Sequence, residues 1–191
     1  MLAAVSIKSL RATVVDSNTF LNCQREISLG LEGSSDGRRR DPSNVPYVDH
    51  VGGVIKNNMI ARDPSVSGDV AILVAASPNT QVLHNTILMR SAYPNAIEYR
   101  FTTTTRALIA NNLTDRAIVA RNGARADVHD NRTSADADMF VEPNHGDLHV
   151  RPTARAAIGH GQWMPTAGVD WDGDPRPMDI VPELGADEVG R

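Results

Sequence analysis

The chain has 191 residues, of which 41% are hydrophobic but only 4% aromatic, so a single domain with a thin, aliphatic core is expected. The formal net charge is −4, and residues 170–191 alone hold seven acidic residues and two arginines, which argues against the basic face of a nucleic-acid-binding protein. One cysteine, no apolar run of about 18 residues and no basic leader before an apolar stretch exclude a disulfide framework, a cysteine-based zinc cluster, a membrane span and a signal peptide within this sequence.

Two columns of residues recur along the first 134 residues and alternate strictly. In one column an asparagine stands two residues before an apolar residue or threonine and three residues after a branched aliphatic residue. Its asparagines are Asn18, Asn58, Asn85, Asn112 and Asn131, and its aliphatics are Val15, Ile55, Val82, Ile109 and Val128. The other column is Ile7, Ile27, Ile72, Ile97 and Ile118. A period of roughly 20–27 residues, with short strands and turn residues between them, predicts a solenoid of β coils.

Stacking gives each column a physical role. Equivalent residues on successive coils lie about 4.8 Å apart, so stacked aliphatic side chains fill a narrow interior. Stacked asparagines at a bend can hydrogen-bond to one another along the stack, and asparagine tolerates the left-handed backbone of a sharp bend. We therefore expect the five asparagines to form a ladder with a structural role.

One repeat is too long, and the chain changes character after the last one. The interval from Ile27 to Asn58 has about 16 residues more than its counterparts, and residues 33–50 are rich in glycine, serine, proline and charge. This stretch predicts a long exposed loop, the first site of tryptic cleavage. Residues 135–191 lack the repeat and are expected to form an irregular segment that caps the last coil.

Four motifs, one within the repeats and three after them, resemble those of a known family. "NAIEYRF" (95–101), "GDLHVRP" (146–152), "DWDGDPRP" (170–177) and "LGADE" (184–188) resemble bacterial repeat proteins of the right-handed parallel β-helix class, the pectate-lyase-like superfamily. The resemblance implies an all-β, right-handed parallel β-helix of about five coils over residues 1–134. It also implies an extracellular or cell-surface protein that binds or cleaves acidic polysaccharides.

The outer face of the coils carries the candidate site. Residues beside an inward isoleucine face outward, which places Lys8, Ser28, Leu73, Glu98 and Val119 in one outward column. Two residues further on, Arg100 and Arg121 lie on adjacent coils, and a pair of guanidinium groups suits a uronate carboxylate. Glu98 and Arg100 are therefore the catalytic candidates for β-elimination, with Arg121 as a ligand-binding residue. The alternative is a solvated face on which Glu98 and Arg100 form an ion pair.

Two shorter motifs resemble catalytic signatures of the same fold only in part. "SIKS" (6–9) resembles the lysine motif of alginate and chondroitin lyases, which would make Lys8 a base or ligand contact. The arginine expected one coil later is absent, because Leu29 and Gly30 stand there. "YVDH" (47–50) resembles a pectate-lyase signature, but its partner arginine motif is missing.

No metal ion is assigned from the sequence. His145 and His149 are four residues apart, but they fall on a turn and a strand rather than on one helical face. Asp170, Asp172 and Asp174 leave calcium open as a cofactor, although the series lacks the register of an EF-hand loop. A turn that closes over the last coil fits these aspartates better.

Two functional hypotheses follow. The first is an extracellular polysaccharide-active protein, lyase-like rather than a glycoside hydrolase. The second is a non-catalytic carbohydrate-binding or surface-structural solenoid. Because Val5 begins a full strand with no cap ahead of it, we expect missing N-terminal coils of a longer chain, or self-association through the first coil. Cys23, among aliphatic residues, is expected to be a buried thiol that reacts slowly.

Overall fold

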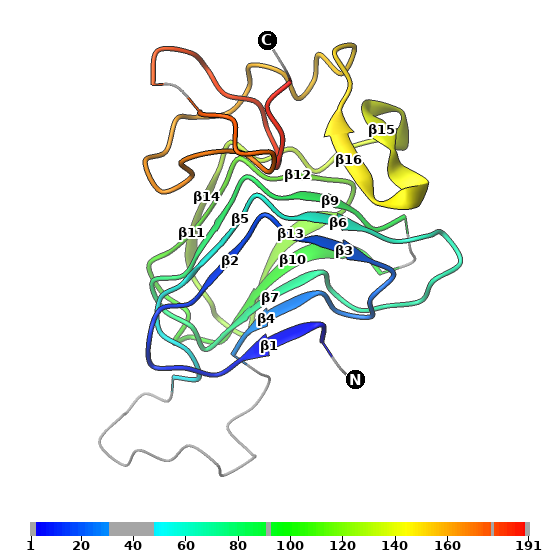
Figure 1. Ribbon diagram of the computed structural model, residues 1–191. Coiled ribbons are helices and arrows are strands. Elements are labelled where there is room, and N and C mark those ends of the chain that lie inside the picture. Colours follow the sequence, from blue (N-terminus) through cyan, green and yellow to red (C-terminus); the bar gives the residue numbers. More distant parts are fainter. Residues whose placement is uncertain (1–2, 31–47, 91–92, 177, 190–191) are drawn as a thin grey trace.

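The protein is built from short strands that stack into three parallel sheets (Figure 1). The computed structural model describes residues 3–30, 48–90, 93–176 and 178–189. Each of the first four coils contributes one strand to each sheet, and the last coil contributes β13 and β14 to two of them, so strands adjacent in a sheet come from successive coils. Among the described residues, no helix is long and apolar enough to cross a membrane.

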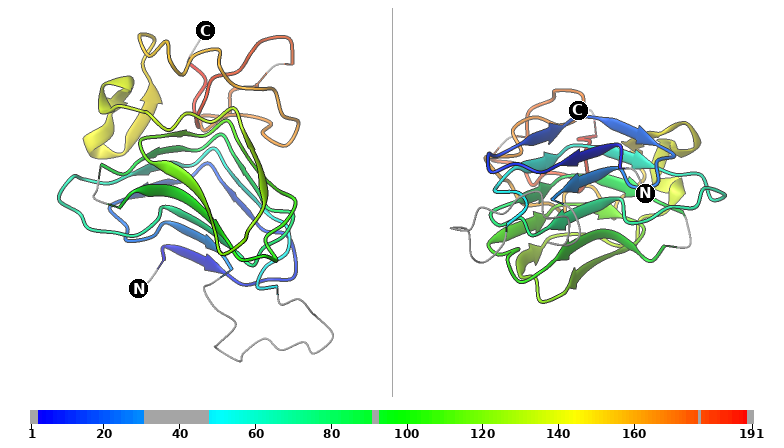
Figure 2. Two further views of the ribbon diagram at one scale, coloured as in Figure 1. Left: turned by 180° about the vertical axis from the view of Figure 1, so that it is seen from behind. Right: turned by 90° about the horizontal axis from the view of Figure 1, so that it is seen from below.

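The strand bounds show how regular the coils are. The first sheet contains β1 (Val5–Ile7), β4 (Ile27–Leu29), β7 (Ile72–Ala75), β10 (Asn95–Arg100) and β13 (Ala117–Arg121). The second sheet contains β2 (Val14–Asp16), β5 (Val54–Lys56), β8 (Gln81–Leu83), β11 (Ala107–Ala110) and β14 (Ala126–His129). The third sheet contains β3 (Thr19–Leu21), β6 (Met59–Ala61), β9 (Thr86–Leu88) and β12 (Leu113–Thr114). This arrangement is a parallel β-helix of about five coils, as the repeat predicted (Figure 2).

The predicted aliphatic columns form the core, apart from the exposed Val128 on the last coil and one error of register. The column that runs from Val15 to Val128 pairs in register along the whole second sheet. In the first sheet Ile27 pairs with Val5, so the placement of Ile7 in the isoleucine column was wrong by two residues. Val5 and Ile7 both pack against the core, because residues two apart on a strand share a face. Hydrophobicity alone therefore did not separate the two registers.

The five asparagines form the predicted ladder. The side-chain Nδ2 of each of the first four donates to the Oδ1 of the next asparagine, at 3.0, 2.9, 2.9 and 2.8 Å from Asn18 to Asn131. The same Oδ1 also accepts a hydrogen bond from the backbone N–H of the preceding ladder asparagine. Asn58, Asn85 and Asn112 are fully buried, so the ladder supplies the hydrogen bonds that these polar groups and the bent backbone need.

The left-handed backbone lies one residue earlier than expected. The residues with positive φ at this bend precede the ladder asparagines, and they are Ser17 (53°), Asn57 (52°), His84 (50°), Asn111 (58°) and Asp130 (49°). Short polar residues tolerate this conformation because their side chains bond locally. The bend thus uses two residues per coil, one that turns the backbone and one that joins the ladder.

The C-terminal segment packs along the flank of the solenoid, where we had expected a cap across its last coil (Figure 1). It includes η2 (Ala137–Met139), β15 (Phe140–Glu142), η3 (Pro143–His145) and β16 (Asp147–Val150). Phe140, Leu148 and Leu184 pack against the outer face of the third sheet, at Met59, Ala61 and other apolar residues that point away from the coil interior. The segment buries this face because it is apolar on three successive coils.

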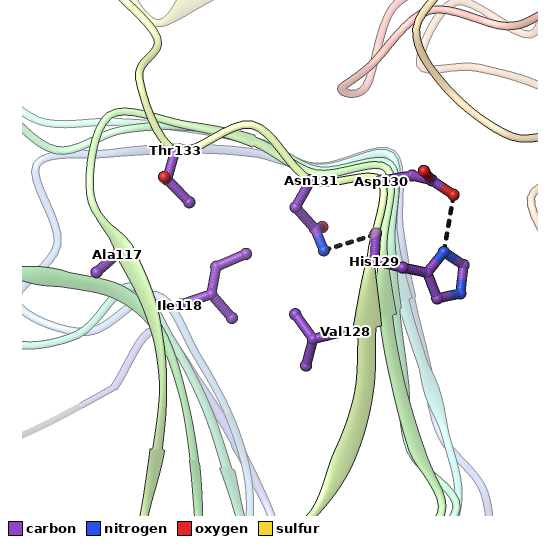
Figure 3. Close-up of a pocket in the computed structure, with 7 residues that line it drawn as sticks. All are labelled: Ala117, Ile118, Val128, His129, Asp130, Asn131 and Thr133. Carbon is purple, nitrogen blue, oxygen red and sulfur yellow. Dashed lines mark hydrogen bonds and ion pairs between the residues drawn. The ribbon is translucent and has the colours of Figure 1, made fainter.

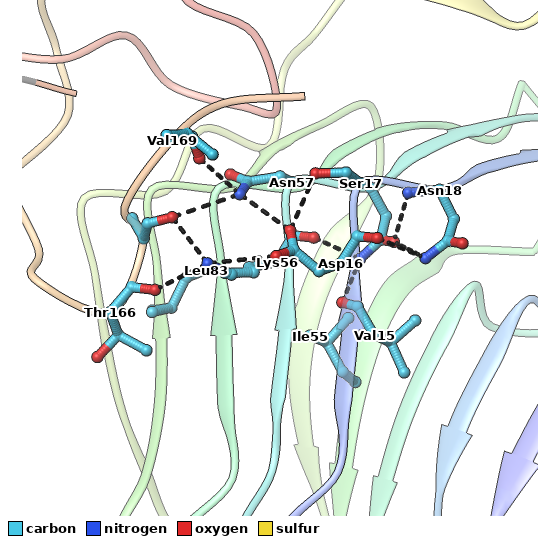
Figure 4. Close-up of polar contacts among 12 residues, drawn as sticks. Val15, Asp16, Ser17, Asn18, Ile55, Lys56, Asn57, Leu83, Thr166 and Val169 are labelled. Carbon is cyan, nitrogen blue, oxygen red and sulfur yellow. Dashed lines mark hydrogen bonds and ion pairs between the residues drawn. The ribbon is translucent and has the colours of Figure 1, made fainter. Parts of the chain in front are cut away.

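Polar contacts fix the segment at the asparagine bend (Figure 4). The Lys56 ammonium donates to the carbonyls of Thr166 and Ala167 at 3.1 and 2.9 Å, and Asn57 Nδ2 donates to the Val169 carbonyl at 2.8 Å. Two coils further, Asn111 exchanges two hydrogen bonds with the Gln162 backbone. The left-handed residues of the bend therefore serve as docking points for the segment.

Two other expectations concern single features. Most of the predicted loop at 33–50 lies outside the described residues, which resume at residue 48. His50, at the end of the predicted loop, is buried and forms hydrogen bonds with Ser77 and Thr13. The prediction of a core position for Cys23 was wrong. Its side chain is partly exposed just after β3, and its Sγ lies 3.7 Å from the Leu21 carbonyl.

We predict that replacing an inner rung of the ladder destabilises the protein more than replacing its first rung. Asn85→Ala removes bonds to Asn112, Leu83 and Ile55 inside a fully buried bend. It should lower the free energy of unfolding by about 3 kcal/mol. Asn18→Ala, at an exposed position, should cost about 1 kcal/mol. Urea denaturation of the two variants measures the difference, and equal losses would contradict the ladder's role.

We predict that Cys23 reacts with a water-soluble thiol reagent in the native protein. Burial, and then the charge of Glu26, raise the pKa of the thiol, so the reactive thiolate is scarce at pH 7. Labelling should therefore be slower than in the unfolded chain and should accelerate as the pH rises towards 9. Labelling that begins only after denaturation would restore the core placement.

Candidate functional site

The candidate residues lie on the outer face of the first sheet. On β10, Ile97 and Tyr99 pack into the coil interior, so Glu98 and Arg100 project outward. Arg121 on β13 pairs in register with Arg100, which places the two guanidinium groups on neighbouring strands. The structure therefore brings Glu98, Arg100 and Arg121 together, as the sequence predicted.

Glu98 is the centre of this cluster. Its Oε1 accepts hydrogen bonds from the Tyr93 hydroxyl at 2.7 Å and from Asn95 Nδ2 at 2.6 Å. Its Oε2 accepts from Arg100 Nε at 2.6 Å, and Arg100 Nη2 completes a close ion pair. Arg121 Nη1 lies 3.4 Å from both oxygens. Both oxygens of the carboxylate thus have partners within the protein.

The cluster continues along the sheet through Tyr93. Arg25 forms a close ion pair with Asp69, and Tyr93 interacts with the carboxylates of both Glu98 and Asp69. Burial, and then the hydrogen bond to Glu98, raise the pKa of the Tyr93 hydroxyl, which therefore stays protonated at neutral pH. Burial, followed by the charges of Arg121 and Arg25, lowers the pKa of Arg100 to about 10.

Burial differs sharply among the three candidates. Glu98 is 0% exposed and Arg100 6% exposed, whereas the Arg121 side chain is 47% exposed. The Glu98–Arg100 pair expected on a solvated face is formed, but it is buried. Arg100 is therefore expected to contribute to stability, because its guanidinium neutralises a carboxylate that water does not reach.

This geometry limits what the cluster can do chemically. A base that removes a proton from a polymeric substrate must approach that proton within hydrogen-bond distance. Glu98 is enclosed and already accepts four donors, and Tyr93 holds its own proton. Arg121 is the exposed member, and its cationic group can pair with an anionic ligand. The cluster is therefore better suited to binding an anion than to abstracting a proton from a substrate.

Lys8 is not part of this cluster. Because Val5 pairs with Ile27, Lys8 follows the column of Gly30 and Ala75 that leads to Arg100, three strand spacings or about 14 Å away. The sequence had placed Lys8 in the column of Glu98, and the two-residue error of register accounts for the difference. The Lys8 ammonium lies 3.4 Å from a carboxylate oxygen of buried Asp49.

A hollow lies at the end of the last coil, apart from the cluster around Glu98 (Figure 3). It has a volume of about 440 Å³, and Ile118 and Val128 point into it from β13 and β14. Asn131 lies at its edge, and His129 is hydrogen-bonded to Asp130 at 2.8 Å. In the described part of the chain, β13 and β14 pair with a strand on one side alone. The hollow is thus the open apolar cross-section of the solenoid.

The aspartates of the acidic tail do not act as one group. Asp170 is buried, and its two oxygens accept the backbone N–H groups of Asp174 and Glu188 at 2.8 and 2.9 Å. It therefore closes a turn and holds the "LGADE" stretch against "DWDGDPRP". Asp172 turns away to contact His149.

Comparison with protein-family models, with curated proteins and with solved structures finds no match for this chain. The assignment of the site therefore depends on the geometry of its residues. Sequence reasoning missed Tyr93, Asn95, Arg25 and Asp69. Asn95 and Tyr93 lie close before Glu98 in the sequence, and an outward carboxylate on a buried strand signals that nearby donors must satisfy it.

We predict that Arg100→Ala lowers the free energy of unfolding by about 3 kcal/mol, because the buried Glu98 carboxylate loses its main partner. Arg121→Ala is the matched control and should cost less than about 1 kcal/mol, since its side chain is half exposed. Urea denaturation gives both values. Combining Arg100→Ala with Glu98→Gln should recover part of the loss, and an Arg100→Ala protein as stable as the parent would contradict the buried pair.

Proposed function

We propose that the protein is a non-catalytic β-helix module that binds an acidic, uronate-containing polysaccharide, outside the cell or at its surface. The ligand would lie on the outer face of the first sheet, with a uronate carboxylate against Arg121. The half-exposed guanidinium of Arg121, beside a second arginine on the neighbouring strand, is the observation that carries this proposal.

The charges around Arg121 support an anionic ligand. Arg25, Arg100 and Arg121 provide three positive charges, and Asp69 and Glu98 provide two negative charges. The two carboxylates are engaged with Arg25 and Arg100, so the excess positive charge lies at the exposed Arg121. A guanidinium group offers two parallel donors to a carboxylate, which gives both affinity and orientation.

The resemblance of the sequence motifs to the pectate-lyase-like superfamily supports a polysaccharide as the ligand. The parallel β-helix is consistent with this resemblance. The lyase-like alternative requires an accessible base near the bound uronate. Glu98 is enclosed, and Lys8 lies about 14 Å from Arg100 along the sheet. We therefore favour binding without cleavage, and propose that Glu98 and Arg100 on β10 have a structural role beside Arg121.

We predict that Arg121→Ala weakens binding to polygalacturonate or alginate at least tenfold while the melting temperature stays within a few degrees. The reason is that the exposed guanidinium loses its charge-assisted bonds to the uronate and contributes little to the fold. Affinity electrophoresis in gels that contain each polysaccharide measures the loss. Neutral dextran in the gel should have no effect.

Arg155→Ala is the matched control, because Arg155 is an exposed arginine on the C-terminal segment. It should bind like the parent protein. Equal binding by the parent and Arg121→Ala would refute the site. Ultraviolet absorbance of an unsaturated product in the same mixtures would overturn the non-catalytic proposal in favour of the lyase.

A further inference from the structure

Three stretches far apart in the sequence meet on the C-terminal segment. "GDLHVRP" supplies Asp147 and His149 on β16, "DWDGDPRP" supplies Asp172, and "LGADE" supplies Asp187. Asp170, which binds the Glu188 backbone, and Asp187, which accepts the Val150 N–H at 2.7 Å, join the three stretches. None of these residues belongs to the cluster around Glu98.

His149, Asp172 and Asp187 each bring one atom that could bind a metal ion into the same small region. The three atoms lie within 4.8 Å of one another. His149 Nε2 and Asp172 Oδ2 are 3.0 Å apart. In a tetrahedral zinc site, with bonds of about 2.0–2.2 Å, neighbouring ligand atoms are about 3.3 Å apart. Side-chain movements of at most about 1.5 Å would therefore bring the three atoms to this geometry.

The His149 ring is already oriented for such a role. Its Nδ1 is hydrogen-bonded to Asp147 Oδ1 at 2.5 Å, which leaves Nε2 directed at Asp172. A carboxylate on the far nitrogen of a histidine fixes the ring and increases its basicity, as in many zinc sites. The ring also meets Trp171 edge to face, with centroids 5.3 Å apart, so packing restricts its rotation.

Asp187 adds a buried and incompletely satisfied carboxylate. It is 4% exposed, and one of its oxygens accepts the Val150 N–H. Its other oxygen has no hydrogen bond to any described residue and is reached by solvent, so it is open to a ligand. Burial raises the pKa of Asp187. Burial lowers the pKa of His149, but its hydrogen bond to Asp147 and the charges of Asp187, Asp147 and Asp172 outweigh this effect, so the net shift is upward.

We propose that His149, Asp172 and Asp187 form a binding site for a divalent transition-metal ion of the zinc class, with Asp147 as the residue that positions His149. An imidazole nitrogen together with two carboxylate oxygens suits zinc, whereas calcium takes oxygen ligands alone. Three protein ligands leave a fourth position for water. Since the ligands come from all three stretches, the ion joins them and stabilises the C-terminal segment on the third sheet.

The test is calorimetric titration of the chelator-treated protein with Zn²⁺ and, separately, with Ca²⁺, followed by thermal unfolding with and without each ion. We expect one Zn²⁺ per chain and a higher melting temperature with Zn²⁺, because an ion that binds only the folded protein stabilises it. Asp172→Asn should bind Zn²⁺ at least tenfold more weakly. This residue is chosen because its side chain is 46% exposed and its replacement should leave the fold intact.

His145→Ala is the matched control, because this histidine lies four residues earlier with an 80% exposed side chain. It should bind Zn²⁺ like the parent protein. Asp147→Asn should weaken binding about 10- to 100-fold without abolishing it, as expected of a positioning residue. Absence of Zn²⁺ binding by the parent, unchanged affinity of Asp172→Asn, loss of affinity in His145→Ala, or a preference for Ca²⁺ would each overturn the proposal.

Discussion

The stacking of coils in register is the constraint on which the rest of this structure depends. Backbone hydrogen bonds hold successive strands about 4.8 Å apart, and each bend must turn the chain without leaving buried polar groups unpaired. The asparagine ladder meets this requirement from Asn18 to Asn131. Because each asparagine bonds to the next coil, a shift of one coil against its neighbour would break the ladder and expose the aliphatic columns.

The same bend also places the C-terminal segment. The left-handed residue ahead of each ladder asparagine points outward, and Asn57 and Asn111 use this position to bind the backbone of residues 162–169. Gly185 approaches so closely that a Cβ there would collide with the Thr86 hydroxyl. The described part of the segment thus lies on the third sheet and does not cover Arg121 on the first sheet.

Two charged clusters, one on the first sheet and one on the C-terminal segment, differ in burial. Around Glu98 a buried carboxylate is satisfied by Tyr93, Asn95 and Arg100, and a half-exposed arginine remains at its edge. Around His149 the carboxylates outnumber the cations, and Asp187 is buried with one oxygen unbonded to any described residue. We therefore propose an anion at the first cluster and a cation at the second, because each site attracts the charge that its own partners do not supply.

The sequence by itself determined the parallel β-helix, the ladder, the aliphatic columns and the proximity of Glu98, Arg100 and Arg121. These features repeat along the chain, and stacking converts a repeat directly into contacts. It did not determine the register of the first coil, because Val5 and Ile7 share a face, nor the burial of Glu98 and Arg100. Only the tertiary structure decided the lateral position of residues 135–189 and the meeting of His149, Asp172 and Asp187. Those contacts join single residues from non-repeating stretches, and no period in the sequence encodes where such stretches pack.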